Sequence, residues 1–358
     1  RGARQKFEAD EVSILAGVRH GVTTGAPVSI RIGNSEWPKW ETVMSADPVD
    51  PSALLIDAGT GDEREIARNR PLTRPRPGHA DLPGMLSYDL PEARPVLERA
   101  SGRETAARVA LGALAEALLE QVAGVRLVSH VIAVGTQRTN SEVVPTPADE
   151  NALCEASMRT LDTADNARFE AAVDEAKHAG DTIGGVVEVI AYGVPVGLGT
   201  HVTARERLDA RLAAALMSIQ SVKGVEIGDG FAQAALLGSA AHDEIVRGAD
   251  GHLTRTTNHA GGIEGGTSNG APIVARAGFK PISTVPRALR SVDLATGEEA
   301  VGLHQRSDTC QVVPGAVIAE AEVALVLADA LFEHAGGRSV SEMRRNLSSY
   351  LEVVGERA

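Results

Sequence analysis

Cysteine is scarce in this sequence: Cys154 and Cys310 are the only two among 358 residues. Neither belongs to a CxxC pair or to an array of cysteine and histidine, so a disulfide scaffold and a structural zinc site both have little support. Two isolated cysteines are typical of a reducing compartment. We therefore expect a cytoplasmic protein without a metal site.

Long apolar runs are also missing. The two most apolar stretches, residues 183–200 and 315–333, are interrupted by glycine and proline in the first and by acidic side chains in the second. A membrane-spanning helix needs about 20 consecutive, mostly apolar residues, and the sequence shows no secretory signal peptide. These features predict no membrane partner.

Basic residues are outnumbered, since 35 Lys and Arg stand against 48 Asp and Glu and give a formal net charge of −13. An acidic surface repels the phosphates of nucleic acids, so no nucleic-acid partner is expected. Hydrophobic residues make up 43% and charged residues 23% of the chain, which is ordinary for a globular protein with a large core. Any basic cluster in such a chain must be local.

Several common signatures are absent as well. The chain has no GxxxxGK[ST] phosphate loop, no HExxH metal helix, no GxSxG nucleophile elbow and no DxDxDG calcium loop. Its glycine clusters do not fit GxGxxG between a strand and a helix, which argues against a dinucleotide-binding domain.

What the sequence does contain is a set of cationic side chains in segments that are poor candidates for helix interiors. In RPRPGHAD, residues 74–81, the two prolines and the glycine oppose a helix, so Arg76 and His79 extend from a stiff segment. Each such residue alone is most simply a solvated surface charge. Several together suit a polyanionic ligand, because arginine matches phosphate and carboxylate geometry. The set comprises Arg4, Arg76, His79, Arg99, Arg103, Lys280 and Arg306.

Two helix–strand units are predicted. The first helix begins at SGRE, where Ser101 and Glu104 form the pattern of a capping box, and it ends at Gly124. The second covers about residues 205–222 and is followed by Gly224. Because both glycines lie between an apolar helix and a strand, we interpret the chain as a single domain with internal pseudo-symmetry.

The remaining pattern predicts further elements along the chain. They are a strand within residues 11–34, a long surface loop over 37–73, a charged helix near 164–179, buried strands within 180–202, and a helix over 315–335 followed by an amphipathic tail helix.

Six long strings, taken together, resemble the chorismate synthase family. They are RPGHAD at 76–81, ERASGRETAARVALGALA at 98–115, GDTIGGVVEVIAYGVPVGLGTHV at 180–202, SIQSVKGVEIGDGF at 218–231, NHAGGIEGGTSNGAPI at 258–273 with KPIST at 280–284, and HQRSD at 304–308. The strings follow the family's order and extend over nearly the whole chain, which makes the resemblance far more specific than one short motif.

This resemblance implies an α+β fold, a β-α-β sandwich with internal pseudo-two-fold symmetry, as a single domain over residues 1–358 that assembles as a homotetramer. It implies a lyase of the shikimate pathway, which leads to aromatic amino acids. The enzyme would form chorismate by anti-1,4-elimination of phosphate from 5-enolpyruvylshikimate 3-phosphate. Reduced FMN would be required although the reaction has no net redox change, and NADPH is the possible reductant.

The resemblance also assigns roles to residues. His79 would donate a proton toward the reduced flavin, and Asp308 would act at flavin N5. The substrate would be bound by Arg4, Arg76, Ser101, Arg103 and Arg306. The flavin would contact Arg99, Ala100, Ser101, Gln220, Ser221, Gly265, Lys280, Pro281, Ile282, Ser283, Thr284 and Arg306, and Arg1 matches a position for NADPH. Cationic groups suit this role because the substrate carries two carboxylates and a phosphate, whose burial together requires counter-charges.

The sequence departs from the family pattern in a few places. The family opens with a GESHG-type segment whose histidine is proposed to protonate the departing phosphate, and we expect this segment upstream of Arg1. This departure keeps one alternative open, a catalytically impaired scaffold that binds anions or flavin. A third reading is a flavin reductase that oxidises NAD(P)H, which the resemblance allows as a coexisting secondary activity. Smaller departures are Gly102 and Ser221 where alanine is more usual, and Thr267 where methionine is usual.

Overall fold

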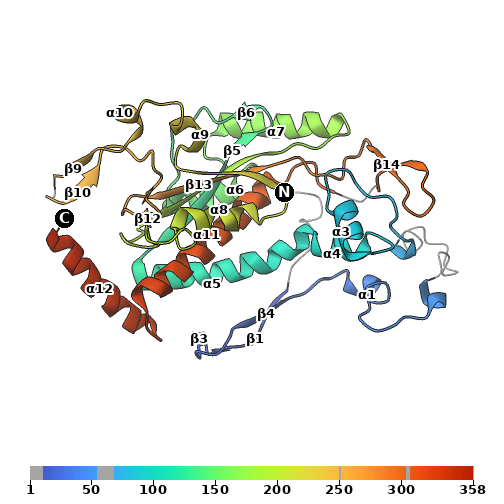
Figure 1. Cartoon of the computed structure of the whole chain (residues 1–358), viewed down its shortest axis with the longest axis horizontal. Helices are drawn as coiled ribbons and strands as arrows, with labels where there is room; N and C mark the ends of the chain where they lie inside the picture. The colour runs from blue at the N-terminus through green and yellow to red at the C-terminus, as the bar shows by residue number, and fades with distance from the viewer. Residues whose placement is uncertain (1–10, 55–67, 250, 304–306, 358) are drawn as a thin grey trace. The chain divides into compact units, whose positions relative to one another are not determined.

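The computed structural model describes residues 11–54, 68–249, 251–303 and 307–357. Contacts between residues divide the chain into two compact units. Unit 1 consists of Arg1–Ala107 with Ser283–Ser307, and unit 2 consists of Arg108–Ile282 with Asp308–Ala358. Figure 1 labels the elements of both units.

Unit 1 begins with a ribbon of antiparallel strands. Strand β1 (Val12–Ala16) pairs with β4 (Ser29–Ile32), and β2 (Val18–Arg19) pairs with β3 (Val22–Thr23). Half-buried and exposed side chains alternate along β4, as expected of a strand with one covered face. The strand predicted within residues 11–34 is confirmed.

Short helices make up most of the rest of unit 1. They are α1 (Trp37–Trp40), the 3-10 helix η2 (Pro51–Leu54), α3 (Asp81–Tyr88), α4 (Arg94–Arg99) and the 3-10 helix η3 (Gly102–Glu104). A small core of Leu72, Met85 and Ala93 holds α3 and α4 together. The hairpin β14 (Arg290–Val292) and β15 (Glu299–Val301) completes the unit. The stretch predicted as one long loop over 37–73 thus contains the helical segments α1 and η2 and helical residues at 68–69.

Unit 2 is organised around a five-stranded antiparallel sheet of order β6-β5-β7-β13-β8. The strands are β5 (Arg126–Val134), β6 (Gln137–Arg138), β7 (Gly185–Tyr192), β8 (Val222–Ile227) and β13 (Ile273–Phe279). Alternate residues of β7 lie in two separate apolar clusters, with Val187 and Val189 in the main core and Ile190 in a smaller one with Leu153. The β-branched runs therefore form the sheet because both of its faces are covered.

One row of side chains in this sheet is polar and hydrogen-bonded. His130 on β5 lies opposite Glu188 on β7, and Glu188 lies opposite Arg276 on β13. His130 Nε2 is 2.9 Å from one oxygen of Glu188, and Arg276 Nε donates to the other at 2.6 Å. Burial opposes ionisation of Glu188, but its two partners outweigh burial and hold its pKa below the ordinary value.

The main core lies between the sheet and a helical layer. Helix α11 (Val312–Ala335) contacts β5, β7 and α8 (Leu208–Met217), and Figure 1 shows it crossing the sheet. Helix α5 (Thr105–Ala123) joins this core through Leu119. Its Gly112 faces α11, where an added Cβ would lie 2.4 Å from the Cβ of Ala321, so only glycine permits this approach.

The remaining elements of unit 2 are shorter or peripheral. They are the 3-10 helix η4 (Pro147–Asp149), α6 (Glu150–Glu155), α7 (Thr163–His178), α9 (Gly230–Gln233), α10 (Gly238–Ala241), β9 (Ile245–Arg247), β10 (Leu253–Arg255), β11 (Ile263–Glu264), β12 (Thr267–Ser268) and α12 (Val340–Arg357). The helices predicted near 164–179 and 315–335 and the tail helix are confirmed. No helix within the described ranges combines the length and apolar character needed to cross a bilayer.

The predicted helix–strand units need one correction. The first matches, with α5 ending at Ala123 and Gly124 at φ +69° before β5. The second helix is α8, Leu208–Met217, and is shorter than the predicted 205–222. Gly224 lies inside β8, and Ser221 at φ +72° takes the left-handed position that Gly124 takes in the first unit. The apolar spacing continued past the helix, whereas the backbone leaves it at the cap residue Ser218.

Candidate active site

The segment that carries Arg76 and His79 is held to the rest of unit 1 by its backbone. Ser291 Oγ donates to the carbonyl of Pro75 at 2.6 Å, and the main-chain N–H of Leu303 donates to the carbonyl of Arg74 at 3.2 Å. Gly78 at φ +76° turns the chain before α3 begins. The prolines keep this segment out of a helix, so its carbonyls are available to these partners.

Arg76, His79, Asp81 and Thr284 form what we call the histidine cluster. Asp81 is fully buried and its two oxygens accept from the main-chain N, Nε and Nη2 of Arg76 at 3.0, 2.8 and 3.0 Å. His79 Nδ1 lies 2.5 Å from Asp81 Oδ1. Arg76 Nη1 donates to Thr284 Oγ1 at 2.9 Å. Residues 208 positions apart in the sequence thus meet around one buried carboxylate.

Asp81 is ionised in this setting. Burial opposes its ionisation, but the hydrogen bonds from His79 and Arg76 outweigh burial and hold the pKa of Asp81 well below its ordinary value. Asp81 and Arg76 therefore neutralise each other's charge. The His79 side chain keeps 17% of its surface exposed, so it is the titratable member that a ligand can reach.

The turn between α4 and α5 carries three further predicted residues. Ser101 caps η3 and its Oγ accepts from the main-chain N–H of Arg103 at 3.2 Å. Arg103 Nη2 donates to the carbonyl of Gly33 at 2.6 Å. The Arg99 side chain is 81% exposed, with Nη2 3.9 Å from Glu104, and Ala100 is the cap residue of α4. The predicted Ser101 cap is confirmed, although its partner is one residue earlier than in a capping box.

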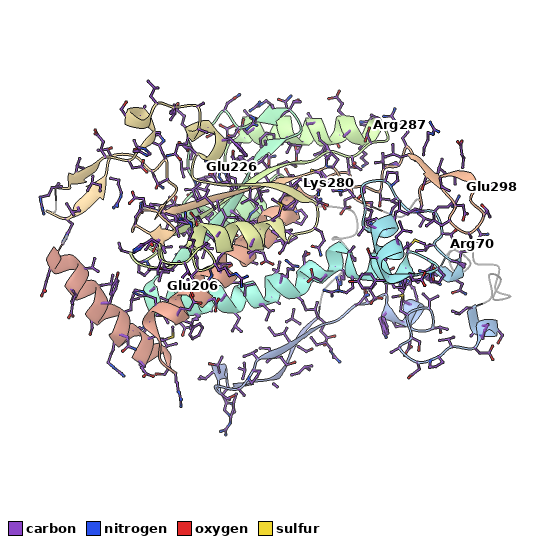
Figure 2. All side chains as sticks on the ribbon, viewed as in Figure 1. Arg70, Glu206, Glu226, Lys280, Arg287 and Glu298 are labelled. Carbon is purple, nitrogen blue, oxygen red and sulfur yellow. The ribbon has the colours of Figure 1, made fainter. Side chains whose placement is uncertain are left out.

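In unit 2, the turn after α8 meets the end of β13. The main-chain N–H of Lys280 donates to the carbonyl of Ser221 at 2.9 Å, next to Gln220. We call Gln220, Ser221, Lys223 and Lys280 the lysine turn; Figure 2 labels Lys280. Partial burial lowers the pKa of Lys280, and the like charge of Lys223 lowers it further. Two cations at this turn would gain from a bound anion.

The segment that follows Lys280 is also anchored. Thr182 Oγ1 donates to the carbonyl of Ile282 at 2.7 Å, which fixes the chain directly after Pro281. Thr284 is buried against Arg76 in unit 1, as described above, and Ser283 precedes it. The KPIST string therefore contributes residues to both units.

Gly265 lies at the tip of the hairpin β11–β12 at φ +60°. A Cβ there would meet only the Cβ of His201, at 3.9 Å, so the backbone at this tip is open. Next to it, the carbonyl of Gly266 accepts from the main-chain N–H of Leu208. The Oγ1 of Thr267 is buried and has no hydrogen-bond partner within the described ranges.

Asp308 precedes α11, and its neighbour Thr309 accepts through its carbonyl from the main-chain N–H of Ile183 at 2.9 Å. The cap residue of α11 is Gln311, whose Nε2 is a buried donor without a partner among the residues that the structure describes. The predicted residues Arg1, Arg4 and Arg306 lie outside the described residues.

Three residues of these sites were not found from the sequence. Asp81 is part of RPGHAD, and its spacing of two residues from His79 was the available signal. Lys223 lies in SIQSVKG next to the predicted Ser221. Gln311 had no signal of its own, because its burial results from packing.

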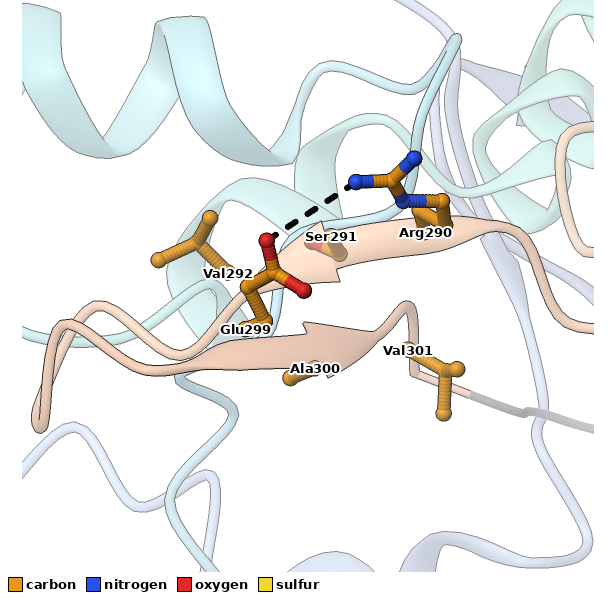
Figure 3. A pocket seen from close by; sticks show the side chains of 6 residues that line it. All are labelled: Arg290, Ser291, Val292, Glu299, Ala300 and Val301. Carbon is orange, nitrogen blue, oxygen red and sulfur yellow. Dashed lines mark ion pairs between the residues drawn. The ribbon is translucent and has the colours of Figure 1, made fainter.

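A hollow of about 710 Å³ lies beside the hairpin β14–β15 (Figure 3). Its lining includes Arg290 and Glu299, whose side chains pair at 3.8 Å and are almost fully exposed. An ion pair between exposed side chains contributes little to stability. The lining of this hollow therefore differs from the histidine cluster, whose Asp81 and Arg76 are buried. Among the described residues, no group of three or more histidine, cysteine or acidic side chains could hold a metal ion.

Known proteins similar to this chain agree with one another. The model of a family described as "Chorismate synthase" matches residues 1–332. A chorismate synthase of Beutenbergia cavernae is 61% identical over 99% of this chain and 88% of that protein. A chorismate synthase of Mycolicibacterium vanbaalenii is 57% identical over 100% of this chain and 86% of that protein.

Among solved structures, one described as "Crystal Structure of Chorismate Synthase" superposes with a TM-score of 0.73. It is 33% identical and covers 97% of this chain and 85% of its own. The expected α+β class is thereby confirmed.

Fold and similarity together define an enzyme of the lyase class. The chain belongs to the chorismate synthase family. The resemblance that the six sequence strings carried is confirmed, and the alternative of an impaired scaffold is not favoured.

Proposed function

We propose that this chain eliminates phosphate from 5-enolpyruvylshikimate 3-phosphate to give chorismate, with reduced FMN as cofactor, NADPH as its possible reductant, and the histidine cluster and lysine turn as working parts. The observation that carries the proposal is the fully buried, ionised Asp81 that holds Arg76 and a partly exposed His79 in one cluster. A cluster built in this way suits proton transfer next to an anion.

The lysine turn is suited to the flavin phosphate. Lys280 and Lys223 are cations whose mutual repulsion a phosphate would relieve. The backbone of Gly265 and the cap of α11 offer polar groups to a ring system, and at this cap the buried Nε2 of Gln311 has no partner among the described residues. When bound, reduced FMN supplies an electron-rich ring that promotes loss of phosphate. The lysine turn, Gly265 and Gln311 would bind and orient the flavin.

The substrate's anionic groups require cations in unit 1. Arg103 and Arg76 are the described candidates, with Ser101 at the same turn as Arg103. Because Asp81 already neutralises Arg76, we propose that Arg76 acts on the substrate mainly through Nη1, which donates to Thr284 and carries a second N–H. Arg4 and Arg306 remain predictions for the same role, and Arg1 for NADPH.

Proton handling is assigned to His79 and Asp308. Histidine exchanges protons near neutral pH, and the exposed part of the His79 ring makes this exchange possible. Asp308 remains the predicted carboxylate for flavin N5. His79 belongs to unit 1 and Asp308 to unit 2. The single domain remains a prediction, and it is supported by α5, a continuous helix whose first residues belong to unit 1 and whose remainder belongs to unit 2.

The homotetramer and the cytoplasmic location also remain proposals. Support for assembly comes from exposed apolar side chains in the segment after β8, where Phe231 is 82% and Leu237 is 81% exposed. Large exposed apolar patches mark interaction surfaces. Native mass spectrometry should give four chains per particle, and a monomer would contradict this proposal.

One anaerobic assay tests the function. The protein is mixed with chemically reduced FMN and the phosphorylated substrate, and chorismate is followed by absorbance. Turnover is expected with supplied reduced flavin. Flavin binding without turnover would favour the scaffold instead, and oxidation of NADPH without chorismate formation would favour the reductase.

A further inference from the structure

We propose that Asp81 is a positioning residue: it fixes the His79 ring in the tautomer that carries its proton on Nδ1, so that Nε2 is the nitrogen that exchanges the catalytic proton. This inference rests on the proposed function. To the proposed function it adds Asp81 as a positioning residue, Nε2 as the reactive atom of His79, and the protonation state of the His79 ring.

The contacts of Asp81 determine its hydrogen-bonding state. Oδ2 accepts from the main-chain N–H and Nε–H of Arg76, and Oδ1 accepts from Arg76 Nη2 and faces His79 Nδ1. These four partners fill the lone-pair positions of one carboxylate. Since Asp81 is fully buried, water does not replace any of them.

An ionised carboxylate can only accept hydrogen bonds. The proton in the 2.5 Å contact with His79 must therefore reside on Nδ1 of the ring. In the neutral ring this leaves Nε2 with a lone pair, and in the charged ring it leaves Nε2–H as the donor. Arg76 Nη2 lies 3.0 Å from Nδ1 and 3.3 Å from Nε2 and carries only donors. With the proton on Nδ1, the acceptor that the ring offers to Arg76 Nη2 is the lone pair of Nε2.

The same contacts predict what Asp81→Asn would do. The single amide oxygen would be drawn to Arg76, whose main-chain N–H and Nε–H are both donors that face one oxygen. The amide NH2 would then face His79 Nδ1 and donate to it. The ring would change to the Nε2–H tautomer, and Nε2 could no longer accept a proton.

The charge around the ring would change as well. Among the described residues, the charged groups that contact His79 are Asp81 and Arg76. Asp81→Asn removes the negative one and leaves the positive one. The positive ring then has no counter-charge in contact with it, so the rate of the variant should depend on pH differently from the rate of wild type.

We would measure kcat and KM for chorismate formation with chemically reduced FMN between pH 5.5 and 8.5 for wild type and Asp81→Asn. A wrong tautomer lowers kcat by about 10⁴-fold in a serine protease, and here we expect at least about a 100-fold loss with KM changed less than about threefold. The matched control is Glu92→Gln, which alters another carboxylate of unit 1 that accepts from the main-chain N–H of Leu72. Glu92→Gln should keep the wild-type profile.

Two outcomes would overturn the inference. One is a kcat for Asp81→Asn close to that of wild type with an unmoved profile. The other is a raised KM with unchanged kcat, because Asp81 would then act only through Arg76 on substrate binding.

A second measurement needs no folded variant of Asp81. In wild-type protein labelled with ¹⁵N-histidine, long-range ¹⁵N–¹H spectra identify the tautomer of each ring, and His79→Gln identifies the His79 signals. The Nδ1–H tautomer is expected, and an Nε2–H ring would refute the inference. Because this spectrum is recorded without substrate, it can succeed even if the wild-type turnover assay fails, so the two failures are distinguishable.

Discussion

Glu116→Gln should stabilise the protein, and more at high pH than at low pH. Glu116 lies on α5 in unit 2 and is partly buried. Burial, and then the like charges of Glu320 and Glu150, raise its pKa from the ordinary 4.5 to about 7, although Arg159 acts in the opposite direction. Arg159 is engaged elsewhere, since its Nη2 donates to Glu150 at 3.0 Å and to Glu320 at 3.2 Å.

The raised pKa means that the folded protein keeps a proton which the unfolded chain releases. The cost of ionising Glu116 is absent below about pH 4.5, grows through the window up to about pH 7 and is complete above it. At 1.36 kcal/mol per pKa unit the full cost is about 3 kcal/mol. Because the side chain is partly exposed, screening by solvent reduces our expectation to about 1–2 kcal/mol.

Glutamine has the shape of the protonated acid and no charge to bury. Urea denaturation followed by circular dichroism should therefore show Glu116→Gln more stable than wild type by about 1–2 kcal/mol at pH 8 and within about 0.5 kcal/mol at pH 5. The control is Glu120→Gln, one turn further along α5 with a side chain 63% exposed. It should change stability by less than about 0.5 kcal/mol at both pH values. An equal gain at pH 5 and pH 8, or a loss at pH 8, would refute the argument.

Three further predictions concern the sites and the core. Lys223→Ala should weaken FMN binding by about tenfold in a fluorescence titration, since a charge-assisted contact is lost, whereas Lys177→Ala, at an exposed position of α7, should not; equal effects would contradict a phosphate at the lysine turn. His79→Ala should keep FMN binding and lose most turnover, and an unchanged rate would remove this histidine from the mechanism. Gly112→Val should lower the free energy of unfolding by about 1–3 kcal/mol, because its Cβ would lie 2.4 Å from that of Ala321; an unchanged urea midpoint would mean that the helices separate at no cost.

Local signals in the sequence predicted the helices well. Helix α5 was found because Ser101 caps the preceding turn and Gly124 takes a positive φ at its end. Helix α8 was predicted too long, since the apolar spacing continues beyond Met217 whereas the backbone does not. A periodic pattern shows which side chains face a core, but it does not show where the hydrogen bonds stop.

The sheet and the sites depend on distant partners that local signals do not reveal. The pairing of β7 with β13 joins residues 88 positions apart at Glu188 and Arg276. Arg76 and His79 were predicted as functional, but the buried carboxylate between them was not, because burial results from the packing of α3. The raised pKa of Glu116 likewise depends on carboxylates from other elements.

The polar row of His130, Glu188 and Arg276 across the sheet of unit 2 affects how its strands align during folding. A slip of one residue in β7 would turn Glu188 from its place between His130 and Arg276 toward the apolar layer that contains Val187 and Val189. An unpaired carboxylate there would be costly. We therefore expect pairings with a shifted register to be destabilised during folding, because His130, Glu188 and Arg276 contact one another only in the native register.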